Sequence, residues 1–168
     1  MLNLESGALL TENLANRAAD IAYNTFQEEA RNAQIKRPDL HIIIMDPTKP
    51  FGYGGSFEDA ILCEIRWGNP DEIYRSIALE KAEVTWRTGR PSHDVQQDAP
   101  HLLKKRNTKW GGSAIHEGQV VACSGVEWFN DQFYSQVLAA TCVRLCIQVM
   151  QENVLPNNEI KFMHEYVA

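Results

Sequence analysis

Two short apolar runs, joined by a tight turn and followed by a long helical pattern, constrain this fold most. Residues 111–115 (GGSAI) and 120–126 (VVACSGV) flank a turn at Glu117 and Gly118. Apolar runs joined by a glycine-containing turn predict a β-hairpin. Both alternating sets of side chains in the second run are apolar or small, which predicts a strand covered on both faces. The hairpin is therefore expected to belong to a buried sheet.

The chain up to Gly89 predicts two helices and two strands. A helix capped by Thr11 is expected to run to about residue 33, because apolar residues recur there at helical spacing. Residues 40–45 (LHIIIM) predict a central strand, and residues 60–66 predict a second one. A second long helix is expected from an Asn69 cap with Pro70 at its first position, ending at Gly89.

The rest of the chain completes an α+β pattern. Two short helical pieces are expected to flank Pro100, and Asn130 or Asp131 is predicted to cap a last long helix. The order of elements predicts an antiparallel sheet covered by helices. With 168 residues, the chain is expected to form one domain over 1–168. Residues 1–38 are interpreted as an N-terminal helical extension. Residues 156–168 are interpreted as a C-terminal tail that forms an extra strand, docks, or is partly disordered.

Charge and composition exclude several classes of partner. The net charge of −6 and the acidic pI argue against nucleic-acid binding, and residues 104–106 (KKR) are interpreted as a solvated helix end. The sequence shows no signal-peptide pattern and no continuous apolar stretch of membrane-spanning length. A cytoplasmic protein without a membrane partner is therefore expected.

The four cysteines predict neither disulfides nor a metal site. Cys142 and Cys146 lie one helical turn apart, but no histidine or second cysteine pair stands at ligand spacing. Reduced thiols that fill the core are the favoured interpretation.

Several motifs, in this order, resemble the GlcG/HbpS-like family of small haem-binding domains. They are residues 77–82 (IALEKA), residues 89–92 (GRPS), the hairpin block from Gly111 to Gly125, and Asp131. The similarity covers residues 42–148. The chain departs from the family pattern at Ala114, where members usually carry proline, and at residues 66–68 (RWG), where they often carry Arg-Met-Asp. The resemblance implies a profilin-like α+β domain with an extra N-terminal helix, haem as the cofactor, and a homo-oligomer.

A set of candidate ligand-binding residues accompanies this resemblance. His93 follows the glycine and proline stop, where a neutral imidazole can serve as an axial haem ligand, so it is also the candidate metal ligand. Lys81, Arg66 and Arg90 can bind the carboxylates of haem or of a small organic acid. Gly111 and Gly112 allow close approach of a ligand or of another backbone.

Each candidate also has a purely structural interpretation. His93 can be an exposed residue at the start of a short helix, and the three cations can pair with Asp71, Glu72, Glu80 or Asp131. The aromatic residues also have three interpretations: flat apolar walls for a porphyrin, a surface for a partner protein, or core packing. These residues are Trp110, Trp128, Phe129 and Tyr134.

Three functions compete at this point. The leading hypothesis is a small-ligand-binding protein that takes haem or a related tetrapyrrole. The second is a non-enzymatic assembly or adaptor protein that binds another protein chain. The third is an enzyme acting on a small carboxylate, which ranks last because no GxSxG, HExxH or paired-carboxylate pattern appears.

Overall fold

A four-stranded antiparallel sheet forms the centre of the protein. The computed structural model describes residues 9–166. The strands are β1 (Leu40–Met45), β2 (Ile61–Trp67), β3 (Ser113–His116) and β4 (Gln119–Ser124), in the spatial order β2-β1-β4-β3. The predicted α+β class and the central position of residues 40–45 are therefore confirmed.

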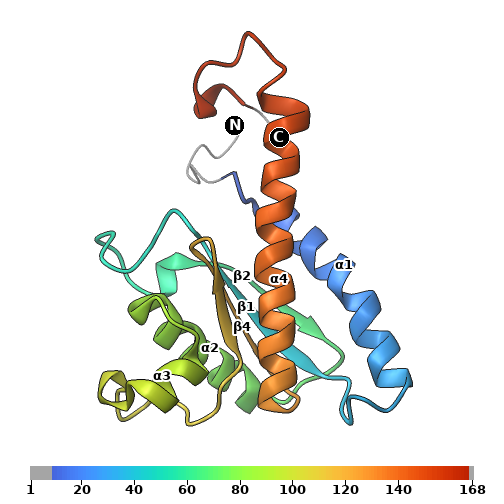
Figure 1. Cartoon of the computed structure of the whole chain (residues 1–168), viewed down its shortest axis with the longest axis vertical. Helices are drawn as coiled ribbons and strands as arrows, with labels where there is room; N and C mark the ends of the chain where they lie inside the picture. The colour runs from blue at the N-terminus through green and yellow to red at the C-terminus, as the bar shows by residue number, and fades with distance from the viewer. Residues whose placement is uncertain (1–8, 167–168) are drawn as a thin grey trace.

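Helices cover both faces of the sheet (Figure 1). One face carries α1 (Glu12–Arg31) and α4 (Trp128–Val149), and the other carries α2 (Glu72–Thr88) and the short α3 (Ser92–Asp98). Short 3-10 turns lie before β2 (Glu58–Ala60) and after α3 (Pro100–Leu102). The helical pieces predicted on both sides of Pro100 are thus present.

The sheet separates two hydrophobic cores, because successive side chains of a strand point to opposite faces. Ile42 and Ile44 of β1 pack with α1 and α4, whereas Ile43 and Met45 pack with α2. All residues of β1 and β4 are buried. The expectation that the strand after the hairpin turn is covered on both faces is confirmed.

The hairpin turn has the backbone that its sequence predicts. Glu117 and Gly118 both have positive φ, at 48° and 81°, and the register pairs His116 with Gln119. Positive φ at both central residues is typical of a type I′ turn, whose twist matches that of the flanking strands.

Two predicted helix starts are wrong, and the third is correct. Thr11 caps α1, with its hydroxyl accepting a hydrogen bond from the Leu14 amide at 3.3 Å. Helix α2 begins after Asp71 rather than Asn69, whose amide instead donates a hydrogen bond to the Asp39 carboxylate at 2.8 Å. Helix α4 begins after Glu127, three or four residues before the predicted caps Asn130 and Asp131.

Helix α4 extends beyond the sheet (Figure 1). It continues as a π-helical turn, Met150–Val154. By length and composition alone, Trp128–Val154 could cross a membrane. Its first half, however, contributes Tyr134, Leu138 and Cys142 to the core beneath the sheet, as the core helix of a soluble domain does. The absence of a membrane partner stays a prediction.

The C-terminal tail does not add a strand within the described part of the chain. Between residues 156 and 166 the only regular element is the 3-10 turn Met163–Glu165. Residues 1–8 of the predicted N-terminal extension and the final two residues of the tail lie outside the described residues. All four cysteines are free thiols.

Candidate functional site

A buried ion pair joins α2 to the start of α4. Lys81 Nζ lies 2.7 Å from Asp131 Oδ2, and the two side chains are only 1% and 3% exposed. Lys81 also donates a hydrogen bond to the Cys123 carbonyl at 2.9 Å, and Asp131 Oδ1 accepts one from the Val126 amide at 3.2 Å. The pair therefore ties two helices to the end of β4. This explains why Asp131, predicted as a helix cap, instead lies inside the protein.

Gly112 makes room for this ion pair. A Cβ atom at Gly112 would lie 2.6 Å from Asp131 Cβ and 2.7 Å from Lys81 Nζ, and its φ of +132° disfavours any side chain. Its carbonyl accepts a hydrogen bond from the Ser135 hydroxyl at 2.8 Å. Glycine is therefore needed here for close packing around the pair, as one of the two interpretations of Gly112 supposed.

Burial shifts the protonation of both partners toward their neutral forms. Desolvation raises the pKa of Asp131 to about 6, although Lys81 and the Val126 amide both favour its carboxylate. Desolvation also lowers the pKa of Lys81, against the attraction of Asp131. An acidic group with a pKa near 6 beside a cation is a common property of functional sites, and it also occurs in structural ion pairs.

The ion pair lies at the wall of a cavity of about 380 Å³ between α2 and the start of α4. We call it the aromatic cavity, after the rings that line it. Its lining residues are Arg37, Tyr74, Ile77, Lys81, Trp110, Ser124, Val126, Glu127, Trp128, Phe129 and Asp131. Trp110 and Phe129 are half exposed, so the cavity opens to the surface. Flat apolar walls with a few charged groups are typical of a small-molecule site.

His93 lies behind one wall of the aromatic cavity and is not part of its lining. Its ring stacks on the ring of Trp128, with centroids 4.1 Å apart and planes 14° from parallel. Gly111 packs against it, because a Cβ atom there would lie 2.8 Å from His93 Cβ. His93 and Gly111 therefore support Trp128, and a role for His93 as a metal ligand stays a prediction.

Arg66 and Arg90 lie away from the aromatic cavity. Arg66 pairs with Glu72 at 2.8 Å, and Arg90 pairs with Asp98 at 3.1 Å. Glu72 was one of the carboxylates expected for these cations. The structure thus brings Lys81 and Gly112 together at the cavity and leaves the two arginines in exposed ion pairs of their own.

Arg37 and Tyr74 are among the cavity residues that sequence analysis missed. Tyr74, Ile77 and Lys81 share one face of α2 at spacings of three and four residues, which is a signal the sequence contains. Arg37 comes from the link between α1 and β1, and nothing in its sequence context pointed to the cavity. Trp110, Trp128 and Phe129 were expected as walls, whereas Tyr134 is fully buried in the core.

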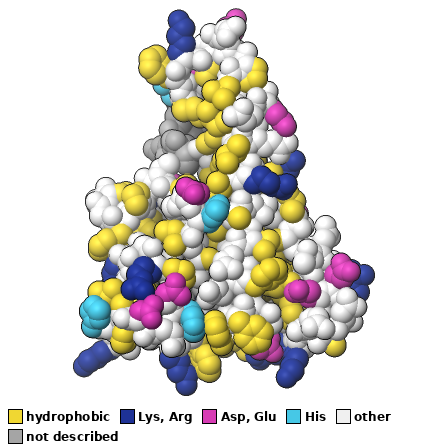
Figure 2. All heavy atoms as spheres, viewed as in Figure 1, with side chains coloured by type: hydrophobic (Ala, Val, Ile, Leu, Met, Phe, Trp, Pro, Cys, Tyr) yellow, Lys and Arg dark blue, Asp and Glu magenta, His cyan; other side chains and the backbone are white. Residues whose placement is uncertain are grey.

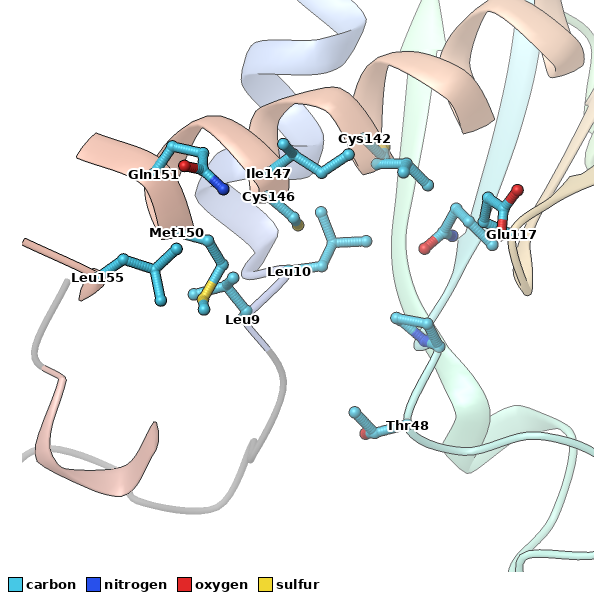
Figure 3. A pocket seen from close by; sticks show the side chains of 13 residues that line it. Leu9, Leu10, Thr48, Glu117, Cys142, Cys146, Ile147, Met150, Gln151 and Leu155 are labelled. Atoms are coloured by element: carbon cyan, nitrogen blue, oxygen red, sulfur yellow. The ribbon is translucent and has the colours of Figure 1, made fainter. Parts of the chain in front are cut away.

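A second hollow runs along the C-terminal half of α4 (Figure 3). We call it the α4 groove. It measures about 480 Å³, and its lining is mainly apolar: Leu9, Leu10, Pro47, Thr48, Glu117, Gln119, Cys142, Val143, Cys146, Ile147, Met150, Gln151 and Leu155. Figure 2 shows apolar side chains gathered over this end of the molecule. Within the described residues, no cluster of histidine, cysteine or acidic side chains could hold a metal ion.

Comparison with known proteins shows similarity in fold only. No family model matches the chain, and no curated protein matches its sequence. A crystal structure described as a PduOC:heme complex superposes with a TM-score of 0.50 at 15% identity, covering 77% of this chain and 89% of that one. Protein ORFY of Klebsiella pneumoniae, described as a DUF336 protein, gives 0.51 at 16% identity, covering 76% and 88%. The chain therefore has the fold that the family resemblance implied.

Proposed function

We propose that this protein binds haem or a related tetrapyrrole in the aromatic cavity. The observation that carries the proposal is an open cavity lined by four aromatic side chains, with the Arg37 guanidinium at its edge. Trp110 and Phe129 are 50% and 55% exposed and line the same hollow, and exposed apolar side chains that gather in one patch mark a site for a ligand or a partner. A neighbour with the same fold is described as a haem complex, which supports this choice of ligand.

The cavity residues fit such a group. Aromatic faces suit a flat apolar ring, and Arg37, at the rim, supplies a positive charge that attracts the carboxylates of the ring system. Lys81 is already paired with Asp131, so it supports the wall rather than offering a free charge. A bound haem would supply an iron that can take up electrons or small ligands. The chain's own residues would hold the ring and keep water from one of its faces.

Haem titration of the purified protein tests this function. Ferric haem is expected to bind with a shifted Soret band, and the double variant Trp110→Ala/Phe129→Ala is expected to weaken binding about tenfold or more. Phe51→Ala is the matched control, because Phe51 is 58% exposed but contacts Trp86 edge to face, outside the cavity. A wild-type protein that takes up no haem would overturn the proposal and favour the adaptor alternative.

We also propose that the protein forms a homo-oligomer through the α4 groove and acts in the cytoplasm. Ile147 and Leu155 at the groove are 56% and 58% exposed. A second copy that covers this apolar end would remove it from water, and the family resemblance favours a second copy over a foreign protein. The molar mass in solution, measured by light scattering, tests the assembly.

A further inference from the structure

Tyr74 occupies a special position at the rim of the aromatic cavity. It lies in the first turns of α2 and lines the cavity together with Trp128 and Phe129. Arg37 Nη1 donates a hydrogen bond to Tyr74 Oη at 2.6 Å, and the guanidinium carbon lies 5.4 Å from the centre of the phenol ring. The phenol oxygen is thus held in place by a positive charge.

The fold itself does not require this contact. Arg37 is an exposed residue in the link between α1 and β1, and Tyr74 is only half buried, so neither belongs to the two hydrophobic cores. An exposed pair of this kind contributes little to stability. Its position beside a hollow that is lined by aromatic rings therefore points to a ligand.

The other polar groups of the cavity are less suited to bind iron. Lys81 and Asp131 bind each other at 2.7 Å, and Asp131 also accepts the Val126 amide. The Glu127 carboxylate accepts a hydrogen bond from the Asn130 side chain at 3.2 Å. No histidine, cysteine or methionine is among the lining residues. His93, the nearest alternative, is stacked behind Trp128.

Building on the proposed function, we infer that Tyr74 binds the iron of a haem seated in the aromatic cavity, through its phenolate oxygen. Tyrosine is an established type of axial haem ligand. If ferric haem binds, the phenol would lose its proton to the solvent, and the iron and Arg37 would balance the resulting negative charge. The oxygen would then lie between the iron and the Arg37 guanidinium, which donates a charge-assisted hydrogen bond to it. Arg37 acts as a positioning residue that holds the phenolate.

Resonance Raman spectroscopy of the ferric haem complex tests this inference. Excitation in a phenolate-to-iron charge-transfer band is expected to enhance tyrosinate vibrations in the wild-type protein and in His93→Ala. The same vibrations are expected to disappear in Tyr74→Phe, which keeps the aromatic ring and still takes up haem. Arg37→Gln is expected to keep the ligand but shift its vibrations, because the charge beside the oxygen is lost.

Tyr53→Phe is the matched control. Its hydroxyl donates a hydrogen bond to the Ser56 carbonyl in a loop away from the cavity, so its removal is expected to leave the spectrum unchanged. Haem uptake without tyrosinate vibrations, or vibrations that persist in Tyr74→Phe, would overturn the role of Tyr74 and leave the haem site standing. Loss of the axial ligand in His93→Ala would assign it to histidine. Failure of the wild-type protein to bind haem would remove both proposals.

Discussion

The aromatic cavity and the α4 groove are two hollows of similar size that differ in what lies at their walls. The aromatic cavity has a buried ion pair, a surface arginine and four aromatic rings. The α4 groove is lined by aliphatic and sulfur-containing side chains, with a few polar groups at its edge. One of these, Gln119, already donates hydrogen bonds to the Met45 and Val120 carbonyls.

This difference suits the aromatic cavity to a specific ligand and the α4 groove to a less specific apolar partner. Directional groups such as a guanidinium or a phenol oxygen can orient one particular ligand, whereas an aliphatic surface gains free energy from any apolar partner of suitable shape. The aromatic cavity is also rigidly built, because Lys81, Asp131 and Gly112 lock α2, α4 and β4 together. We therefore expect substitutions at the cavity wall to cost folding stability, and substitutions on the groove surface to cost almost none.

Removal of Lys81 is expected to have the largest effect. Lys81→Met leaves the Asp131 carboxylate buried without a counter-charge, which typically costs about 3–5 kcal/mol in the free energy of unfolding. Urea denaturation followed by circular dichroism measures this loss. In the double variant Lys81→Met/Asp131→Leu no charge remains buried, and most of the lost stability is expected to return. A double variant no more stable than Lys81→Met would show that the ion pair is not the cause.

Gly112→Ala is expected to have the next largest effect. The new methyl group would meet Asp131 and Lys81 and would sit on a backbone with positive φ, so a loss of about 3 kcal/mol is expected. Gly118→Ala is the matched control, because Gly118 also has positive φ but a Cβ atom there would meet nothing within 4 Å. That control is expected to lose about 1–2 kcal/mol. Equal losses in the two variants would mean that backbone strain, not the ion pair, explains Gly112.

The sequence predicted the frame of the molecule better than its site. Period-two and helical patterns with local turn residues placed the four strands and the long helices, because those signals act between near neighbours. Asp131 was misread as a cap, since a carboxylate near a helix start has the same local pattern whether it faces solvent or a buried lysine 50 residues away. Arg37 meets Tyr74 across a separation of 37 residues, and no local pattern encodes such a contact.

The ionisation of Asp131 predicts that the free energy of unfolding depends on pH, whereas no such contribution is expected from the residues of the α4 groove. The pKa of Asp131 is raised from 3.8 to about 6. Between these two pH values the folded protein therefore keeps a proton on Asp131 that the unfolded chain has released. The free energy of unfolding is therefore expected to fall as pH rises from about 4 to about 6, by up to about 1.4 kcal/mol per pH unit, and then to level off.

Asp131→Asn keeps the shape of the side chain and is expected to remove this part of the slope. Urea denaturation at several pH values measures both proteins. Cys142→Ala, a variant at the base of the α4 groove, serves as the comparison and should lose stability by the same amount at every pH, because burial raises the pKa of that thiol to about 12. Parallel curves for the wild type and Asp131→Asn would contradict the raised pKa.

The smallest effect on folding is expected on the groove surface, where the effect on assembly should be largest. Ile147 is 56% exposed on α4, so Ile147→Asp is expected to change the free energy of unfolding of the single chain by no more than about 0.5 kcal/mol. If a second copy covers the groove, the same substitution places a charge in an apolar interface and should shift the molar mass toward that of the monomer. Ile73→Asp is the control, because Ile73 is 60% exposed on α2 and does not line the groove. An Ile147→Asp protein that keeps its wild-type mass would show that the oligomer does not form through the groove. That result would leave the proposal for the aromatic cavity, at the other end of α4, unaffected.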